Sequence, residues 1–307
     1  MSIDVLISKL VFEKNMSELP ILFKILRIKQ WYKNIVIFLP LVFSLSLLNL
    51  DSLSLTIVGF VALCLASSAL YIRNDILDVE SDKQHPIKKF RPLASGQTSK
   101  KNAYIVFVLL LSSSLIIAAI TSWQLVIVLI FLFVNTTVYS HWLKKFVYVD
   151  LLSISLNFVI RVLAGLVLLP PEFFGIISPW LIFGVFLVAF FLGLMKRKSE
   201  IITLKEKAVL HREVLSKYSM KNLNYSLLIV SVLVMITYSL YSSTNDPTGD
   251  NRLIFTIPIV AIIIFRQYYL SERSISLNKF SEVINDKISL LAIIVYVITT
   301  ISLLYIF

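Results

Sequence analysis

Nine apolar stretches, most of them close to the length of a membrane-spanning helix, constrain this chain more than any other feature. A helix needs about 20 consecutive, mostly apolar residues to cross the hydrocarbon core of a bilayer. In lipid, backbone groups are satisfied only within helices or closed barrels, and these runs are continuous rather than alternating. The sequence therefore predicts an all-α, polytopic membrane protein. The stretches lie at about 35–50, 53–77, 103–121, 123–142, 151–170, 176–195, 224–243, 253–271 and 288–307.

Lysine and arginine gather on one side of these stretches, in the N-terminal arm and in the connections after the second, fourth, sixth and eighth. The exceptions are Arg161, inside the fifth stretch, and Arg252. The positive-inside rule makes the basic side cytoplasmic, so we expect a plasma (inner) membrane protein with its N-terminus inside and its C-terminus outside. The net charge of +11 divides among membrane-flanking loops and gives no reason to expect a nucleic-acid partner.

The sequence predicts one domain over residues 1–307, with residues 1–34 as an N-terminal arm that shows no signal-peptide pattern. Within the arm, Ile21–Lys33 is typical of an amphipathic helix at the membrane interface, with Lys24, Arg27 and Lys29 able to meet lipid phosphates. Cys64 is the single cysteine, so an internal disulfide is excluded, and its position in mid-span favours a packing role.

Three aspartates stand at the inner end of the second stretch, in the segment Asn74-Asp-Ile-Leu-Asp-Val-Glu-Ser-Asp82. Asp75, Asp78 and Asp82 are spaced i, i+3 and i+7, so on a helix they fall within about 60° of one another. Such a stripe of carboxylates is repulsive without a cation, and oxygen ligands suit Mg²⁺ together with substrate phosphates. We therefore expect a magnesium-diphosphate site at the membrane surface, with Asn74 beside it; a solvated helix end is the alternative.

Cationic residues follow these aspartates directly, since Lys88, Lys89 and Arg91 lie in the next loop. Phosphate oxygens that a metal does not neutralise need cationic donors, and arginine offers a planar fork that suits them. An ordinary positive-inside loop is the alternative. Adjacency to the carboxylates favours phosphate binding, most of all for Arg91. His85 is a weaker candidate, because a single loop histidine is more often solvated than catalytic.

A second polar cluster begins at Tyr139 and Lys144 and continues into the fifth stretch. There, Asp150, Asn157 and Arg161 are spaced i, i+7 and i+11 and fall within about 40° on a helix. Arg161 lies roughly three turns into the membrane, where a charge needs a partner or a hydrated cavity. A structural ion pair and a cavity-lining role both remain open, and either one turns this face of the helix inward.

A third cluster, Lys196-Arg-Lys-Ser-Glu200, leaves the sixth stretch. Lys196 and Glu200 are i, i+4 and could simply pair on an exposed turn, or the cluster could bind phosphate. Lys33 and Asn34, before the first stretch, are suggested only by their location. All of these groups lie on the predicted cytoplasmic side. We therefore expect nine helices around one central cavity that opens to the cytoplasm.

These residues resemble the UbiA-type intramembrane prenyltransferase superfamily over nearly the whole chain. Its signature is Asn74-Asp75-x-x-Asp78-x-x-x-Asp82, and the resemblance implies nine helices with active-site loops on the cytoplasmic face. Within the superfamily, the chain is most similar to the decaprenyl-phosphate phosphoribosyltransferase branch. The matching stretches are Gln30–Asn34, Phe38–Pro40, Asn74–Gly96, Tyr139–Lys144, Asp150–Gly165, Ser178–Trp180 and Lys196–Glu200.

The resemblance implies that phosphoribosyl diphosphate (PRPP) is the donor and polyprenyl phosphate the acceptor, with Mg²⁺ held by the three aspartates as the catalytic group. Members that transfer a prenyl group usually carry a second aspartate-rich motif after the sixth span. This chain has Lys196, Arg197 and Glu200 there, which suits an anionic partner better than a second metal pair. The candidate substrate-binding residues are Lys33, Asn34, Asn74, Lys88, Arg91, Tyr139, Lys144, Asp150, Asn157, Arg161, Lys196, Arg197 and Glu200.

Two alternative functions remain at this point. One is a prenyltransferase that moves a prenyl group from its diphosphate to an aromatic or other small acceptor. The other is a transporter, for which an intramembrane arginine and a polar inner cavity would also be expected. Against a transporter, the polar clusters lie only on the predicted cytoplasmic side, and no matching set reaches the outer loops.

Overall fold

Every regular element that the computed structural model describes is a helix, which confirms the all-α prediction. The description covers residues 21–84, 88–173, 177–204, 213–244, 246–272 and 286–306. The chain divides into two compact units, each considered by itself below. Unit 1 comprises Met1–Ile35 and Phe60–Ile120, and unit 2 comprises Val36–Gly59 and Thr121–Phe307.

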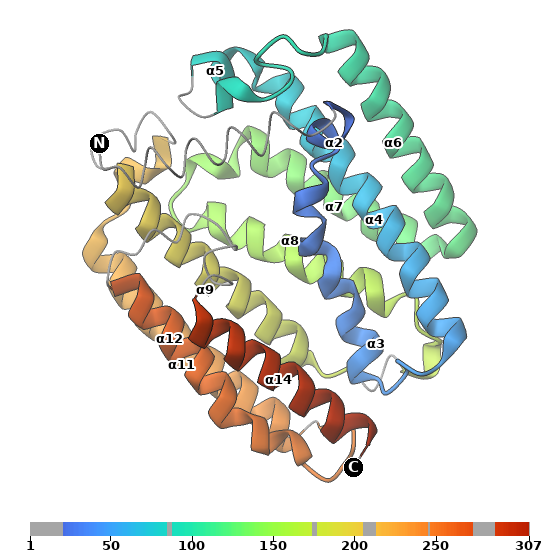
Figure 1. Cartoon of the computed structure of the whole chain (residues 1–307), viewed down its shortest axis with the longest axis vertical. Coiled ribbons are helices and arrows are strands. Elements are labelled where there is room, and N and C mark those ends of the chain that lie inside the picture. The colour runs from blue at the N-terminus through green and yellow to red at the C-terminus, as the bar shows by residue number, and fades with distance from the viewer. Residues whose placement is uncertain are drawn as a thin grey trace. The chain divides into compact units, whose positions relative to one another are not determined.

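Among the described residues, eight helices are long and apolar enough to cross a membrane (Figure 1). They are α4 (Leu50–Leu77), α6 (Lys100–Thr121), α7 (Trp123–His141), α8 (Val149–Leu166), α9 (Pro179–Leu204), α11 (Met220–Thr244), α12 (Ile257–Glu272) with the preceding 3-10 turn η7 (Arg252–Thr256), and α14 (Lys287–Tyr305). Each helix corresponds to one predicted stretch. Two residues at the ends of those stretches, Ile176 and Phe307, lie outside the described residues. Helix α9 runs beyond its predicted end and carries the whole Lys196–Glu200 segment.

The first predicted span, 35–50, is not one continuous helix. A 3-10 helix, η1 (Ile28–Phe38), is followed by a short α3 (Leu39–Phe43) that has a proline in its first turn, and turns occupy residues 44–49. Leu45 has a φ of 60°, which ends the helix. The Tyr305 hydroxyl holds the turn, donating to the Val42 carbonyl at 2.7 Å and accepting from the Leu47 N–H at 3.2 Å. The prediction of nine full spans is therefore not met in the described part of the chain.

In unit 1, the segment before α3 is fastened along α4 by polar side chains. Trp31 Nε1 donates to Ser68 Oγ at 3.0 Å, and Ser68 Oγ donates to the Leu26 carbonyl at 2.7 Å. The predicted interfacial helix, Ile21–Lys33, is consequently two pieces. Helix α2 (Ile21–Leu26) ends at Arg27, whose φ is 50°, and η1 follows. Ser114 of α6 donates to the Ala62 carbonyl of α4 at 2.8 Å.

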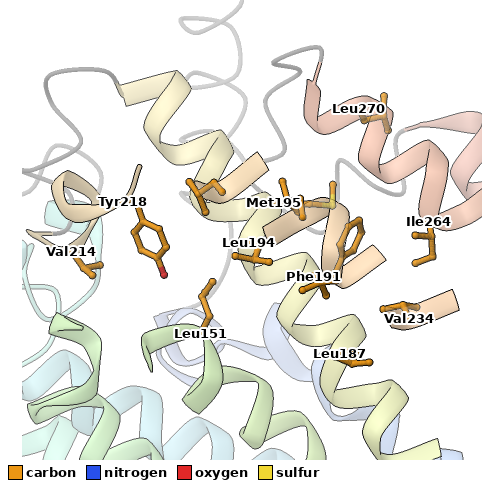
Figure 2. Packing of buried hydrophobic residues seen from close by; sticks show 13 residues of the cluster. Leu151, Leu187, Phe191, Leu194, Met195, Val214, Tyr218, Val234, Ile264 and Leu270 are labelled. Carbon is orange, nitrogen blue, oxygen red and sulfur yellow. The ribbon is translucent and has the colours of Figure 1, made fainter. Parts of the chain in front are cut away.

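In unit 2, helices that are consecutive in the sequence pack side by side, from α7 through α8, α9, α11 and α12 to α14. The core lies around α9, where Phe191 and Leu194 are fully buried beside Leu151 of α8 (Figure 2). Leu227 of α11 belongs to the same buried cluster. The 3-10 turn η6 (Glu213–Lys217) and the adjoining Tyr218 close one end of this core. The start of α8 is therefore fixed by packing on several sides.

Gly165 is required where α8 meets the backbone of Ile37 within unit 2. A Cβ at this position would lie 1.9 Å from the Ile37 carbonyl oxygen. We expect Gly165→Ala to lower the free energy of unfolding by about 1–3 kcal/mol, because the backbone must move. Thermal unfolding in detergent measures this. Gly184→Ala in α9 is the matched control, since the nearest atom there is 3.8 Å away, and it should be neutral or slightly stabilising. Equal melting temperatures would contradict the close approach.

Asp286 caps the N-terminus of α14 and also binds an arginine. Its Oδ2 accepts from the Ser289 N–H at 2.9 Å, and Arg266 donates to both carboxylate oxygens. The Arg266 hydrogen bonds are the main reason that the pKa of Asp286 lies well below its usual value. Asp286→Ala should therefore cost about 1 kcal/mol of stability at neutral pH, the usual worth of a cap.

A depressed pKa contributes stability that is complete above the unfolded-state value of about 3.9 and is lost as pH falls further. The difference between the melting temperatures of the wild type and Asp286→Ala should therefore be constant from pH 7 to about 5 and shrink below about 4. A difference that grows on acidification would show that the carboxylate charge is not what matters.

Candidate functional site

The three signature aspartates lie where α4 passes into the short helix α5 (Val79–Gln84) in unit 1. Asp78 is a turn residue between the two helices, yet its N–H bonds to the Asn74 carbonyl at 2.9 Å, and the N–H of Asp82 bonds to the Asp78 carbonyl at 2.8 Å. These bonds continue the helical i to i−4 pattern across the break. As a result, Asp75 and Asp82 both contact the same side chain, that of Arg91.

Arg91 lies between two of the carboxylates. Its Nη1 is 3.0 Å from Asp75 Oδ1 and 2.6 Å from Asp82 Oδ2. Lys88 Nζ is 3.9 Å from Asp82 Oδ1, and Arg27 contacts Asp75 Oδ1 as well. Burial raises the pKa of the Asp82 carboxyl, although the nearby cations act against this. The structure thus brings together Asp75, Asp82, Lys88 and Arg91, as the sequence predicts, and adds Arg27.

The donor set fits a magnesium ion in its chemistry. One carboxylate oxygen of Asp75 and one of Asp82 contact the same guanidinium nitrogen of Arg91. Both carboxylates can therefore reach a single cation. Oxygen ligands are those that Mg²⁺ prefers. Within the described ranges, however, no three acidic, histidine or cysteine side chains are grouped closely enough to hold a metal. Ligation by all three aspartates therefore stays a prediction.

Asn34 is placed differently from what its location in the sequence suggested. Its side chain is buried in unit 1, where Nδ2 donates to Cys64 Sγ at 3.2 Å and Oδ1 accepts from Ser67 Oγ at 3.3 Å. The Asn34 amide therefore fastens η1 to α4, and its substrate-binding role stays a prediction. Its neighbour Lys33 lies with Nζ 5.9 Å from the centre of the Tyr32 ring. Lys33 stays a candidate on its location alone.

Among the described residues of unit 2, a buried ion-pair network surrounds Arg197, which is 1% exposed. Arg197 Nε donates to Asp150 Oδ2 at 2.9 Å, and its Nη1 donates to Glu200 Oε2 at 2.8 Å. The other oxygen of Asp150 accepts from the Tyr218 hydroxyl at 2.6 Å. Figure 2 shows Tyr218 beside Leu151, the residue that follows Asp150 on α8.

In this network Arg197 binds both Asp150 and Glu200, and the substrate-binding roles of all three residues stay predictions. The guanidinium is shared between two buried carboxylates. The Glu200 carboxylate pairs with Arg197, an ion pair that was not predicted from the sequence. We therefore assign the three residues to holding α8 against α9.

Tyr218 is a member of this network that sequence reasoning missed. Besides binding Asp150, its hydroxyl accepts from the Tyr148 N–H at 2.9 Å, and the two rings meet edge to face with centroids 5.3 Å apart. Tyr148 has a φ of 64°, an unfavourable conformation for a residue with a side chain. Burial raises the pKa of Tyr218, so the hydroxyl stays protonated as a donor. No sequence spacing links Tyr218 to Asp150, since they come from different elements.

Two members of the predicted polar stripe on α8 contact each other. Arg161 is buried and its Nη1 donates to the Asn157 carbonyl at 2.6 Å. The Asn157 side chain accepts from Asn135 of α7 at 3.0 Å, a partner that the sequence did not identify. Tyr139 and Lys144 are half-buried at the end of α7 and in the following turn η3 (Leu143–Lys145), and Lys196 is exposed on α9. These residues keep their predicted roles as candidates.

Comparison with known proteins decides the family. A model of the UbiA prenyltransferase family matches residues 35–280. The chain belongs to the UbiA prenyltransferase family. This confirms the resemblance that the signature aspartates indicated. Together with the eight apolar helices, it makes the chain an integral membrane protein.

Curated relatives of this UbiA family member include decaprenyl-phosphate phosphoribosyltransferases. The protein from Mycolicibacterium smegmatis is 29% identical over 233 residues, covering 75% of this chain and 72% of its own. The protein from Mycobacterium tuberculosis is 28% identical over 249 residues, covering 78% and 80%. This agrees with the branch to which the sequence is most similar.

Solved structures show the UbiA fold. A UbiA homolog from Archaeoglobus fulgidus bound to GPP and Mg²⁺ superposes with a TM-score of 0.70 at 16% identity, covering 94% of this chain and 100% of the other. A digeranylgeranylglyceryl phosphate synthase superposes with a TM-score of 0.64 at 18% identity, covering 92% and 95%. At these identities the likeness establishes the fold of this UbiA family member. Its substrates have to be inferred from the site residues.

Proposed function

We propose that this protein transfers 5-phosphoribose from PRPP to a polyprenyl phosphate, giving polyprenyl-phosphoryl-5-phosphoribose and diphosphate in a magnesium-dependent reaction. The observation that carries the choice of donor is the state of Glu200, the one acidic residue in the segment Lys196–Glu200. Its carboxylate is buried and bound to Arg197. It is therefore poorly suited to a second metal pair of the kind that prenyl-transferring members carry. The names of the curated relatives support the same choice.

Asp75, Asp78 and Asp82 would hold the magnesium ion, which when bound neutralises negative charge on the departing diphosphate. Lys88 and Arg91 lie beside these carboxylates and would donate to diphosphate oxygens that the metal leaves exposed. In the transfer, the bond between ribose C1 and the diphosphate oxygen breaks, and a bond from a lipid phosphate oxygen to C1 forms. The lipid phosphate is already anionic, so the reaction needs positioning more than a general base.

Tyr139, Lys144, Arg161 and Lys196 are the remaining candidates for the ribose 5-phosphate and the lipid phosphate. Arg161 is the most buried of them, and its Nη1 donates to the Asn157 carbonyl. A cation fixed in this way within a membrane helix is a functional-site candidate by default. Asn74 stays a candidate through its place beside Asp75.

A direct assay tests the proposed function. Purified protein in lipid nanodiscs would be incubated with Mg²⁺, ribose-labelled PRPP and polyprenyl phosphates of several lengths, and the lipid product identified by mass spectrometry. Parallel reactions would contain geranylgeranyl diphosphate with aromatic acceptors. We expect label in a lipid-linked phosphoribose. Prenylation of an aromatic acceptor without any reaction of PRPP would refute the proposal and favour prenyl transfer, which the family membership equally permits.

The proposed orientation places the aspartate end of α4 on the cytoplasmic side of the plasma membrane. It rests on the distribution of lysine and arginine. Ser95 is exposed in the loop before α6, and Cys64 is buried, so a single cysteine can be introduced in a Cys64→Ser background. We expect Ser95→Cys to react with a membrane-impermeant maleimide only after the cells are opened. Labelling in intact cells would reverse the orientation.

A further inference from the structure

Two arginines share one carboxylate oxygen in unit 1. Arg27 Nη2 and Arg91 Nη1 both contact Asp75 Oδ1, and Arg91 Nη1 also binds Asp82. With Lys88 beside Asp82, three cationic groups surround two carboxylates. Each of these two carboxylates therefore has more than one cationic partner. Cations that share a carboxylate at a half-buried position can also donate to an anionic ligand.

The local fold fixes where Arg27 points. Its φ of 50° places a residue with a side chain in the left-handed region, and the chain on both sides is fastened to Ser68 through the Leu26 carbonyl and Trp31 Nε1. The guanidinium lies 5.1 Å from the centre of the Tyr71 ring, a cation–π distance. Backbone strain of this kind persists only where the surroundings over-determine it, and it is concentrated at functional sites. The contact of Arg27 with Asp75 replaces its predicted role at the lipid surface.

A divalent cation at Asp75 and these guanidiniums would compete for the same oxygen. Mg²⁺ binds carboxylate oxygens directly, so its arrival would deprive Arg27 and Arg91 of their shared counter-ion. A guanidinium that loses its partner in a half-buried place needs another anion. A diphosphate brought in with the metal supplies oxygens that accept paired hydrogen bonds from arginine.

We propose that Arg27 is a diphosphate-binding residue, which rests on Asp75 while the site is empty and passes to the diphosphate of the substrate when a divalent cation takes the carboxylate. The proposal depends on the magnesium-diphosphate site of the proposed function. It does not depend on whether ribose or a prenyl group carries the diphosphate.

Calorimetric titration of the purified full-length protein tests this with two probes, Mg²⁺ alone and inorganic diphosphate at saturating Mg²⁺. In Arg27→Gln, diphosphate affinity should fall roughly tenfold or more, because a charge-assisted pair is lost. Affinity for Mg²⁺ alone should rise a few-fold, roughly, because a competitor for Asp75 is removed. Lys29→Gln is the matched control. It removes the same charge from an exposed position in the same segment and should change neither affinity.

Opposite shifts are the diagnostic result, since local damage at Arg27 would weaken both ligands together. Arg27→Lys keeps the positive charge but lacks the planar guanidinium. Its diphosphate affinity should lie between those of the wild type and Arg27→Gln. If Arg27→Gln does not fold, Arg27→Lys provides the test of the role of Arg27. Wild-type diphosphate affinity in the lysine variant, or parallel weakening of both ligands in either variant, overturns the role of Arg27. If the shifts are opposite but PRPP is not consumed, the proposed function fails while the role of Arg27 stands.

Discussion

Asp75→Asn is expected to lower turnover by about a thousandfold or more, which corresponds to roughly 4 kcal/mol of transition-state stabilisation. The substitution keeps the shape of the side chain but removes the charge that would hold the metal and that now binds Arg27 and Arg91. Loss of charge neutralisation on a departing diphosphate is costly because that charge develops in the transition state. Steady-state transfer of labelled phosphoribose measures the effect.

Glu80→Gln is the matched control for Asp75→Asn. Glu80 belongs to the same segment, but its side chain is exposed and pairs with Lys83 and Lys100 at the surface. It should retain wild-type turnover. Activity should also disappear in excess chelator and return with Mg²⁺. Asp78→Asn tests the third ligand separately, because the structure groups Asp75 and Asp82 but not all three. Wild-type rates for Asp75→Asn, or full turnover in chelator, would contradict the assignment of a metal site.

Arg197→Ala is expected to destabilise the protein by about 3–5 kcal/mol, or to prevent its accumulation, because it leaves two buried carboxylates without their cation. Asp150 is 0% exposed and Glu200 is 5% exposed, so water cannot replace the guanidinium at either one. Loss of Arg197 should also release the start of α8, where Tyr218 and Asp150 meet. Thermal unfolding in detergent is the measurement.

Lys196→Ala is the control for stability, since Lys196 is the exposed neighbour of Arg197 on the same helix. It should melt close to the wild type. The combined variant Arg197→Met, Asp150→Asn, Glu200→Gln removes all three charges together and should recover much of the stability, because no unpaired buried charge remains. A stable Arg197→Ala protein with a raised Michaelis constant for PRPP would instead restore the phosphate-binding interpretation.

Local patterns in the sequence determined the membrane class and most of the helices. A run of about twenty apolar residues has one stable backbone solution in lipid, so eight of the nine predicted spans correspond to helices in the described chain. The stretch 35–50 failed because its end is set by Tyr305, a residue more than 250 positions away. The aspartate spacing likewise predicted that Asp75 and Asp82 face the same way, because i and i+7 lie together on any helix.

Tertiary structure decided which charges meet. The sequence predicted Arg27 as a lipid-facing cation, whereas in the structure it contacts Asp75, 48 residues away. The sequence did not identify the partners of Arg197. A fully buried guanidinium needs paired carboxylates, and Asp150 and Glu200 supply them. The hydrogen-bond partners of Asn34 and Tyr218 are likewise distant in the sequence. The sequence by itself therefore determined the membrane-spanning class, the signature and the family. Only the packing of distant segments assigned each polar side chain to a counter-ion or to a site, because the free energy of a buried charge depends on neighbours that helical periodicity does not specify.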